Sequence, residues 1–310
     1  MAEVKKIATR ESYGNALAAL GKEKENLVVL DADLAGATKT GTFKKLFPDR
    51  HIDCGIAEAN MMTIAAGLST TGLVPFASTF AMFAAGRAYE QIRNSIGYPH
   101  MNVKIGATHA GITVGEDGAT HQCNEDIALM RTIPGMTVIV PSDDIEAKAA
   151  VKAAYEMEGP VYLRFGRLAV PVINEKEDYT FEIGKGIILR EGKDLTIVAT
   201  GVTVAASLEA ADMLAADGIE AKVINIHTIK PLDEALIVAA AKETGKVYTV
   251  EEHSVIGGLG GAVAECLAEK CPVSVIRLGI KDTFGYSGPA AKLLEDFGLD
   301  AKGIYAQIKG

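Results

Sequence analysis

Short apolar runs alternate with longer segments in which apolar residues recur every three or four positions, and this alternation covers nearly the whole chain. The short runs predict buried strands, and the periodic segments predict amphipathic helices. In the first half, strands are expected at 26–30, 74–77, 101–105, 136–140 and 161–164, and helices at 11–21, 58–71, 84–96 and 143–157. Helices between strands are typical of a largely parallel sheet that is covered on both faces.

A polar segment from Pro171 to Tyr179 interrupts the pattern, which then resumes. The second half predicts strands at 195–199, 221–225, 246–250 and 273–276, and helices at 203–217, 232–243 and 257–270. We therefore expect an α/β protein with a doubly wound parallel-sheet domain over residues 1–170, a linker over 171–180 and a smaller α/β domain over 181–310.

The chain has 310 residues and a formal net charge of −9. Its length suffices for two domains with cores of their own. An acidic chain without a run of Lys or Arg is not expected to bind nucleic acid or a membrane surface, although a single local arginine still suits a phosphate. No apolar run reaches the roughly 18 residues needed to cross a bilayer. The N-terminus lacks the core of a signal peptide, so we expect a cytoplasmic protein.

The four cysteines, at positions 54, 123, 266 and 271, include no Cys-x-x-Cys pair. This spacing indicates neither a disulfide framework nor a zinc site, and we expect reduced thiols and no metal ligands in this chain. Cys123 follows His121 by two residues, which makes it a weak candidate for a nucleophile. Packing is the preferred interpretation.

Candidate chemistry is densest between His109 and Gln122, a stretch with two of the six histidines, two carboxylates and three glycines. The glycines permit tight turns, and the polar side chains offer titratable groups to a ligand. An ordinary turn with two surface histidines is equally compatible with this composition. Because ligands of parallel sheets bind at the carboxyl ends of the strands, Asp31, Asp33 and His109 are expected at one edge.

Three further segments each allow two interpretations. Glu58 begins an apolar helix, where it either complements the helix dipole or acts as a desolvated carboxylate of raised pKa that holds or passes a proton. Phe80 and Phe83 follow a strand, either as core residues or as a platform for a flat heterocycle. Arg164 and Arg167 also follow a strand, either as a grip on phosphate or as surface ion pairs.

The Gly-rich segment 251–261 follows a predicted strand and precedes a helix, as a phosphate-binding loop does. It lacks both the Gly-x-Gly-x-x-Gly spacing and the Walker lysine. We therefore interpret it as close helix–strand packing or an interface loop.

These segments, in this order, resemble the C-terminal portion of transketolase. The resemblance is carried by Gly-Ile-Ala-Glu-Ala-Asn-Met at 55–61, Pro-Phe-Ala-Ser-Thr-Phe-Ala-Met-Phe at 75–83, the loop 109–122, Pro-Ser-Asp-Asp at 141–144 and Glu-Glu-His-Ser-x-x-Gly-Gly-Leu-Gly at 251–260. It implies the pyrimidine-binding domain of a thiamine-diphosphate enzyme, followed by the smaller transketolase C-terminal domain.

The Gly-Asp-Gly motif with which this family binds the diphosphate does not occur in the 310 residues. The resemblance therefore implies a split enzyme. An N-terminal, diphosphate-binding subunit would bring the diphosphate site and the divalent cation, Mg²⁺ or Ca²⁺. Two copies of each chain would form an α2β2 assembly that contains a dimer of this chain.

The resemblance also assigns roles on the cofactor side. Glu58 matches the glutamate that hydrogen-bonds the aminopyrimidine ring and promotes proton transfer there, so it is expected to be catalytic. Phe80 and Phe83 match aromatic residues that line the pyrimidine pocket. Ile56 and Leu34 are expected to contact the cofactor as well.

On the substrate side, His109 and His121 match loop histidines that contact the sugar, and His121 is expected to be catalytic by stabilising charge on a substrate oxygen. Asp33 and Asp117 match carboxylates that bind sugar hydroxyls, and Arg167 matches a phosphate-binding arginine. The implied reaction moves a two-carbon ketol unit from a ketose phosphate, such as xylulose 5-phosphate, to an aldose phosphate, such as ribose 5-phosphate.

Two departures from the family pattern concern the sugar phosphate. Ala37 stands where many relatives have a phosphate-binding serine, and Thr38 and Lys39 are adjacent substitutes. Ala57 and the pair 59–60 replace the Arg and His that flank the glutamate in many relatives.

Three alternative functions stay open at this point. Two are enzymes: the beta subunit of a 2-oxoacid dehydrogenase first component, and half of a 1-deoxyxylulose-5-phosphate synthase-like enzyme. The third is a catalytically silent regulatory subunit that kept the fold.

Overall fold

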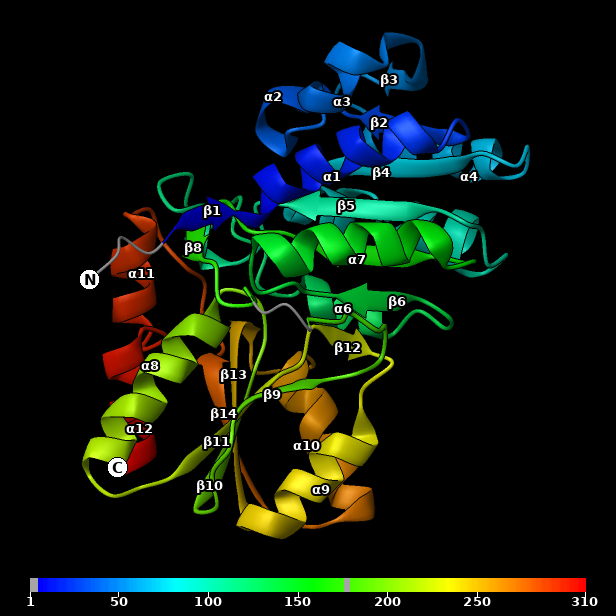
Figure 1. The fold of residues 1–310 in the computed structure, drawn as a ribbon. Coiled ribbons are helices and arrows are strands. Elements are labelled where there is room, and N and C mark those ends of the chain that lie inside the picture. Colours follow the sequence, from blue (N-terminus) through cyan, green and yellow to red (C-terminus); the bar gives the residue numbers. More distant parts are fainter. Residues whose placement is uncertain (1–4, 176–178) are drawn as a thin grey trace.

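Two sheets covered by helices make up the structure, a computed structural model that describes residues 5–175 and 179–310 (Figure 1). The N-terminal sheet has the strand order β12-β6-β7-β5-β4-β2-β3. Its strands are β2 (Leu27–Asp31), β3 (His51–Asp53), β4 (Val74–Phe80), β5 (Lys104–Thr108), β6 (Thr137–Ile139), β7 (Val161–Arg164) and β12 (Thr228–Lys230). Neighbouring strands are parallel except for β12, which is antiparallel to β6.

The C-terminal sheet has the order β14-β13-β10-β11-β9, and only β9 is antiparallel to its neighbour. Its strands are β9 (Ile187–Arg190), β10 (Leu195–Ala199), β11 (Ala221–Asn225), β13 (Lys246–Ser254) and β14 (Ser274–Ile280). A short antiparallel pair, β1 (Lys6–Ala8) with β8 (Ala169–Pro171), joins the start of the described chain to the end of the first sheet unit. Both sheets confirm the predicted α/β class.

Helices cover both sheets. The α-helices are α1 (Thr9–Glu23), α2 (Ala35–Thr38), α3 (Gly41–Leu46), α4 (Glu58–Ser69), α5 (Tyr89–Gln91), α6 (Asp126–Arg131), α7 (Asp144–Glu156), α8 (Thr203–Ala216), α9 (Glu234–Thr244), α10 (Leu259–Lys270), α11 (Ala290–Asp296) and α12 (Ala301–Lys309). Single turns of 3-10 helix lie at η1 (Pro48–Arg50) and η4 (Ile112–Val114), and π-helical turns lie at η2 (Phe83–Arg87) and η3 (Ile92–Gly97).

The strands of the N-terminal sheet are apolar on both faces, because each face is covered. Val29 and Phe76 pack with Leu17 of α1 on one face, whereas the next residues, Leu30 and Ala77, belong to the cluster that α4 covers. Successive side chains of a strand point to opposite faces, so continuous apolar runs are what two covered faces require. Figure 1 shows α1 and α7 side by side over the first of these faces.

The segment 84–96 is helical, as predicted, but it is not one regular α-helix. Two π-helical turns flank the short helix α5, and the Ala88 N–H bonds back to the Phe83 carbonyl, five residues earlier (3.2 Å). A one-residue insertion in a helical turn hardly alters the spacing of apolar positions, so periodicity did not reveal it. The strand predicted at 246–250 also extends to Ser254 and takes Glu251 into the sheet.

The two halves interlock. Strand β12, from the second half of the sequence, completes the N-terminal sheet, and the Val140 N–H donates to the His227 carbonyl (2.7 Å) just before it. The boundaries predicted at 170 and 180 stay a prediction, and positions 176–178 of the expected linker lie outside the described residues. In the described part of the chain, no helix is both long and apolar enough for a bilayer crossing.

Candidate functional site at the carboxyl edge of the N-terminal sheet

Predicted site residues follow the ends of neighbouring strands. We call this the carboxyl edge: the carboxyl ends of β3, β2, β4, β5 and β7, which are adjacent in that order. The edge carries, in strand order, Ile56 and Glu58 after β3, Asp33 and Leu34 after β2, Phe80 and Phe83 at β4, His109 after β5 and Arg167 after β7. Register pairs Phe80 with Thr108, so β4 and β5 end level, and it pairs Asp31 with Ser78, so β2 ends two residues before β4. Four strand spacings make the edge about 19 Å long.

Glu58 lies at one end of the carboxyl edge, at the first residue of α4, and is 5% exposed. Its Oε1 accepts from Nη1 of Arg87 (3.1 Å). The guanidinium of Arg87 also lies over the Phe83 ring, 3.9 Å from the centroid. Sequence reasoning missed Arg87, which is held at this place by the π-helical turn that begins at Phe83.

Aromatic rings form a continuous stack in the middle of the carboxyl edge. Phe80 stacks on Phe83 on one side (centroids 5.4 Å apart) and on His109 on the other (3.8 Å). His121 meets Phe83 edge-on at 5.5 Å. The structure thus brings together both predicted phenylalanines and both predicted histidines, although His109 and His121 are separated by a loop of eleven residues. The rings form an apolar cluster that carries the ring nitrogens of the two histidines at its border.

The opposite end of the carboxyl edge is cationic. Arg10, on the first turn of α1, donates from Nη1 to Nε2 of His109 (2.9 Å) and to the carbonyl oxygen of Ala37 (3.2 Å). Burial, together with the charges of Arg10, Arg167 and Lys39, lowers the pKa of His109 to about 3. A guanidinium only donates, so the Nε2 of His109 is an acceptor, and its Nδ1–H faces the hydroxyl of Thr108 (2.9 Å). His109 is therefore neutral, with its basic nitrogen already bonded.

Sequence reasoning also missed Arg10. The local sequence Thr9-Arg10-Glu11 looks like the solvated first turn of a helix, and only the packing of α1 under the segment 35–40 turns the guanidinium toward His109. The Nε of Arg10 is buried without a hydrogen-bond partner in the described structure. A buried donor without a partner is uncommon and suits a place where an anion binds.

The remaining predicted residues lie around these groups. Arg167 is half-buried and donates to the Val114 carbonyl (2.5 Å), and its Nη1 lies 3.5 Å from Asp117 Oδ2. Asp33 is exposed with φ of +61°, and its N–H donates to Asp53 Oδ1 (3.1 Å). Leu34 is half-buried, whereas Ile56 is 77% exposed. Ile56 is thus on the surface of this chain beside Glu58.

Arg164 is not available to a ligand. It is 5% exposed, with Nε 2.9 Å from Asp126 Oδ2 and Nη2 2.9 Å from the Glu252 carbonyl. The Oε1 of Glu252 in turn accepts from the N–H of Thr113 (2.5 Å). The loop after His109 is therefore fastened to the C-terminal sheet, and the interpretation of Arg164 as a phosphate ligand is wrong.

The Gly-rich segment after β13 serves packing, as predicted. Glu251 accepts from the N–H groups of Leu259 and Gly260 (2.7 and 2.8 Å) at the start of α10. A Cβ on Gly258 would lie 2.0 Å from that carboxylate, so only glycine permits this approach. Cys123 is buried in the core, and burial raises the pKa of its thiol, which agrees with the packing interpretation.

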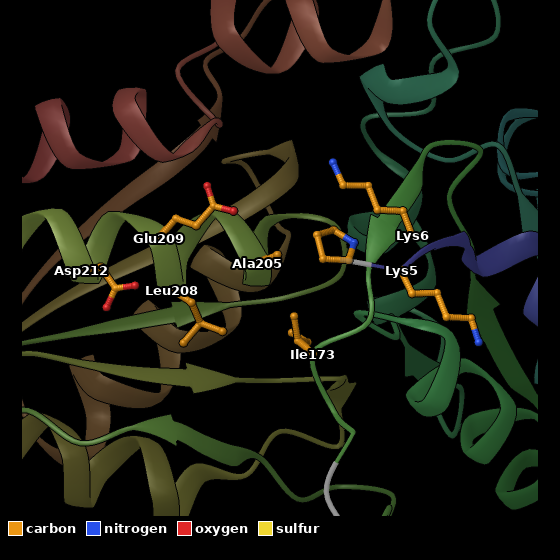
Figure 2. Close-up of a pocket in the computed structure, with 8 residues that line it drawn as sticks. Lys5, Lys6, Ile173, Ala205, Leu208, Glu209 and Asp212 are labelled. Atoms are coloured by element: carbon orange, nitrogen blue, oxygen red, sulfur yellow. The ribbon is translucent and has the colours of Figure 1, made fainter. Parts of the chain in front are cut away.

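A large pocket lies away from the carboxyl edge. Figure 2 shows it between Lys5 and Lys6 on one side and Glu209 and Asp212 of α8 on the other, with a volume of about 900 Å³. It contains none of the predicted site residues. A second pocket of about 750 Å³ borders the loop 109–122 through Thr120 and Gln122 and is also lined by Phe284, which is 82% exposed. Within the described ranges, no group of three His, Cys, Asp or Glu side chains is arranged to hold a metal ion.

Comparison with known proteins gives the family. Residues 5–172 match the family model of the transketolase pyrimidine-binding domain, and residues 184–304 match that of the transketolase C-terminal domain. A protein named as a transketolase C-terminal section from Methanocaldococcus jannaschii is 54% identical, covering 96% of this chain and 94% of its own. A 6-deoxy-6-sulfo-D-fructose transketolase subunit from Clostridium sp. is 45% identical, covering 95% and 91%.

A solved structure agrees with these relatives. It is described as a split-gene transketolase, an inactive beta4 tetramer, and superposes with a TM-score of 0.91 at 56% identity, covering 98% of this chain and 97% of its own. The chain therefore belongs to the transketolase family, with a pyrimidine-binding domain followed by a transketolase C-terminal domain.

Proposed function

We propose that this chain is one subunit of a split, thiamine-diphosphate-dependent transketolase that transfers a two-carbon ketol unit between sugar phosphates. It works with a separate N-terminal subunit, as two copies of each chain. The chain covers nearly the whole length of relatives that are named as a section or a subunit of transketolase. The observation that carries the proposal is the carboxyl edge, which has a buried carboxylate beside aromatic rings at one end and cations at the other.

The residues around Glu58 fit the aminopyrimidine half of thiamine diphosphate. A flat heterocycle with N–H donors needs an aromatic wall and a buried acceptor, and Phe80, Phe83 and Glu58 offer both. When bound, the cofactor supplies the carbon nucleophile and the electron sink for breaking a carbon–carbon bond. We assign the receptor of the diphosphate and the divalent cation, Mg²⁺ or Ca²⁺, to the partner subunit.

Glu58 is the proposed proton-exchanging group of this chain. Its carboxylate would hydrogen-bond a ring nitrogen of the pyrimidine and hold or pass the proton there. Arg87 uses the same carboxylate and the same face of Phe83, so it has to move aside when a ring enters. The Arg87 side chain is 55% exposed, and its displacement therefore disturbs little packing. Ile56, exposed beside Glu58, and Leu34 are proposed cofactor contacts that the partner covers.

The other end of the carboxyl edge would hold the sugar phosphate. His109, neutral and bonded to Arg10, is suited to orienting a substrate oxygen rather than to taking its proton. His121 is half-buried beside Phe83, and we assign it the stabilisation of charge on the substrate oxygen. Asp33 and Asp117 are assigned to sugar hydroxyls, and Arg167 to the phosphate.

The test is turnover by the assembled two-chain protein with different donors. The chain is mixed with a partner chain that carries the Gly-Asp-Gly motif, thiamine diphosphate and Mg²⁺. We expect ketol transfer from xylulose 5-phosphate to ribose 5-phosphate, and none from either chain alone. Pyruvate decarboxylation without ketol transfer would favour a 2-oxoacid dehydrogenase component. Condensation of pyruvate with an aldose phosphate would favour a deoxyxylulose-phosphate synthase. Absence of any turnover would favour a silent subunit.

A further inference from the structure

We propose that Lys39 makes this site selective for substrates with a dianionic phosphate end over substrates with a monoanionic end, such as a sulfonate. The inference rests on the proposed function and names a specificity residue within it. It starts from the segment 37–40, which lies beside the cationic end of the carboxyl edge and has Ala37 at the position expected to bind phosphate.

Lys39 is the residue of this segment whose side chain can reach an anion. The Ala37 methyl group has no donor. The hydroxyls of Thr38 and Thr40 are buried and donate to Asp31 Oδ2 (2.7 and 2.8 Å). Lys39 is one-third exposed, and its only ion pair in the described structure is a long one, 3.8 Å to the half-exposed Glu11. Exposed pairs of this kind are weak, so the ammonium group remains free to bind a ligand.

Packing places the backbone of Lys39 against α1, the helix that carries Arg10. Lys39 has φ of +69° in the turn between α2 and α3, and α1 packs directly against this turn. A Cβ on Gly14 would lie 2.3 Å from the Lys39 carbonyl oxygen, so glycine at this position of α1 permits the contact. Arg10 is one helical turn before Gly14 and bonds the Ala37 carbonyl (3.2 Å). Both cations therefore act on the same ring: Arg10 bonds the Nε2 of His109, and the charge of Lys39 helps to lower the pKa of His109.

The charges around Lys39 and Arg10 decide which anionic substrates this end of the carboxyl edge prefers. Arg167 approaches from the end of β7, but Glu116 and Asp117 lie 3.6 and 3.5 Å from its Nη1 and offset its charge. Arg10 and Lys39 carry most of the remaining positive charge, and the buried Nε of Arg10 has no partner in the described residues. Each cation attracts a dianion about twice as strongly as a monoanion at the same distance. Removing the charge of Lys39 should therefore weaken the binding of a phosphate more than the binding of a sulfonate.

The experiment measures the KM values of acceptors with the assembled two-chain enzyme and hydroxypyruvate as the donor. The variant is Lys39→Met, Lys39→Arg restores the charge, and Lys45→Met removes a charge from an exposed lysine of α3. For Lys39→Met we expect the KM of ribose 5-phosphate to rise about ten-fold, as loss of one charge-assisted contact predicts. The KM of glycolaldehyde, which carries no charge, should stay unchanged, and so should kcat.

Selectivity gives a second readout. With a phosphorylated and a sulfonated ketose as donors, the kcat/KM ratio in favour of phosphate should fall several-fold in Lys39→Met, stay near the original value in Lys39→Arg, and be unaffected in Lys45→Met. If wild type transfers ketol units and Lys39→Met behaves like Lys45→Met, this inference is wrong and the proposed function stands. If the wild-type assembly transfers ketol units to no acceptor, the proposed function fails and this inference fails with it.

Discussion

Glu58 is buried, but Arg87, its ion-pair partner, is exposed to solvent. The carboxylate is 5% exposed, whereas the Arg87 side chain that pairs with it is 55% exposed. A general acid or base at this place contributes about 10²- to 10⁴-fold to a rate. We therefore predict that Glu58→Gln lowers kcat of the assembled enzyme at least about 100-fold.

Thermal unfolding of the Glu58→Gln chain should stay close to that of wild type, because the amide keeps the size of the side chain. Glu90→Gln, at an exposed carboxylate of α5, is the matched control and should leave kcat unchanged. A Glu58→Gln enzyme with more than half of the wild-type kcat would contradict the role assigned to Glu58.

Arg87 is predicted to compete with the cofactor. Its guanidinium lies on Phe83 and on the Glu58 oxygen, which are the groups that we assign to the pyrimidine ring. When an internal group occupies a site for part of the time, the apparent affinity of a ligand falls by that fraction. We expect Arg87→Met to lower the Kd of thiamine diphosphate for the assembled enzyme several-fold in titration calorimetry. A raised Kd would mean that Arg87 instead holds Glu58 ready for the ring.

At the residue scale, sequence reasoning found the groups that follow strands and missed those that depend on tertiary packing. Phe80 and His109 meet because two neighbouring parallel strands end level, which could be predicted from the alternation of elements. Arg10 faces His109 only because α1 passes under the segment 35–40, and Arg87 faces Glu58 only because of a π-helical turn. Neither arrangement has a local sequence signal.

At the element scale, the loop 109–122 is held by the C-terminal sheet rather than by its own turns. Glu252 of β13 accepts from the Thr113 N–H, and a Cβ on Gly111 would lie 2.3 Å from the Glu252 carboxyl carbon. Gly111 also has φ of +73°, where an L side chain costs about 1 kcal/mol or more. The position therefore needs glycine for two separate reasons.

The contact with Glu252 can be separated from the backbone cost with a pair of variants. Gly72→Ala, at φ of +86° with no atom within 4 Å of the added Cβ, introduces the backbone cost alone. We predict that Gly111→Ala lowers the free energy of unfolding by about 1–3 kcal/mol more than Gly72→Ala does, and that it also lowers kcat by moving His109. Chemical denaturation of both variants measures the difference. Equal losses would show that the contact with Glu252 does not constrain the loop.

His227, which precedes β12, should make the junction of the two sheets sensitive to acid. Its side chain is fully buried against Phe181 (ring centroids 4.2 Å apart), and burial lowers its pKa from 6.5 to about 4. The folded state thus binds fewer protons than the unfolded state between these values. The contribution of a neutral His227 is fully present above pH 6.5 and is lost as the pH falls toward 4.

The prediction compares how the free energy of unfolding depends on pH in wild type and in His227→Gln. From pH 7 to pH 4, the free energy of unfolding should fall by up to about 3 kcal/mol more in wild type than in His227→Gln. Glu251 and Glu252, whose pKa values burial raises to about 7, titrate in both proteins and cancel. Denaturant unfolding at several pH values gives both curves. Parallel curves would mean that His227 titrates alike in the folded and unfolded chains.

The regular elements were the most predictable part of the fold. Strands β2, β4, β5 and β7 are buried along their whole length because helices cover both of their faces. The helix α7 begins at Asp144, one residue after the expected Asp143, which is its N-cap and accepts from the Glu146 N–H (2.9 Å). Short strands such as β12 were not predicted, since three residues carry no periodicity. Their pairing is decided by the partner strand, which a local pattern does not contain.

At the scale of the whole molecule, the chain presents its site on the surface. Glu58 is buried, but Ile56 beside it is 77% exposed and Arg87 is exposed as well, so the end of the carboxyl edge that we assign to the cofactor lacks a cover on this chain. A catalytic site of this kind needs walls that exclude water, because charge–charge and hydrogen-bonding interactions strengthen when water is excluded. We propose that the N-terminal subunit provides the missing wall together with the receptor of the diphosphate.

Titration calorimetry tests this division of the site most directly. Thiamine diphosphate is titrated, in the presence of Mg²⁺, into this chain alone and into the two-chain assembly. Charge-assisted contacts to the diphosphate supply much of the affinity and are assigned to the partner. The assembly should bind at micromolar concentration, and the isolated chain should show no saturation below about 1 mM, a difference of about 4 kcal/mol in binding free energy. Equally tight binding by the isolated chain would contradict the central claim that this chain holds only the pyrimidine half of the site.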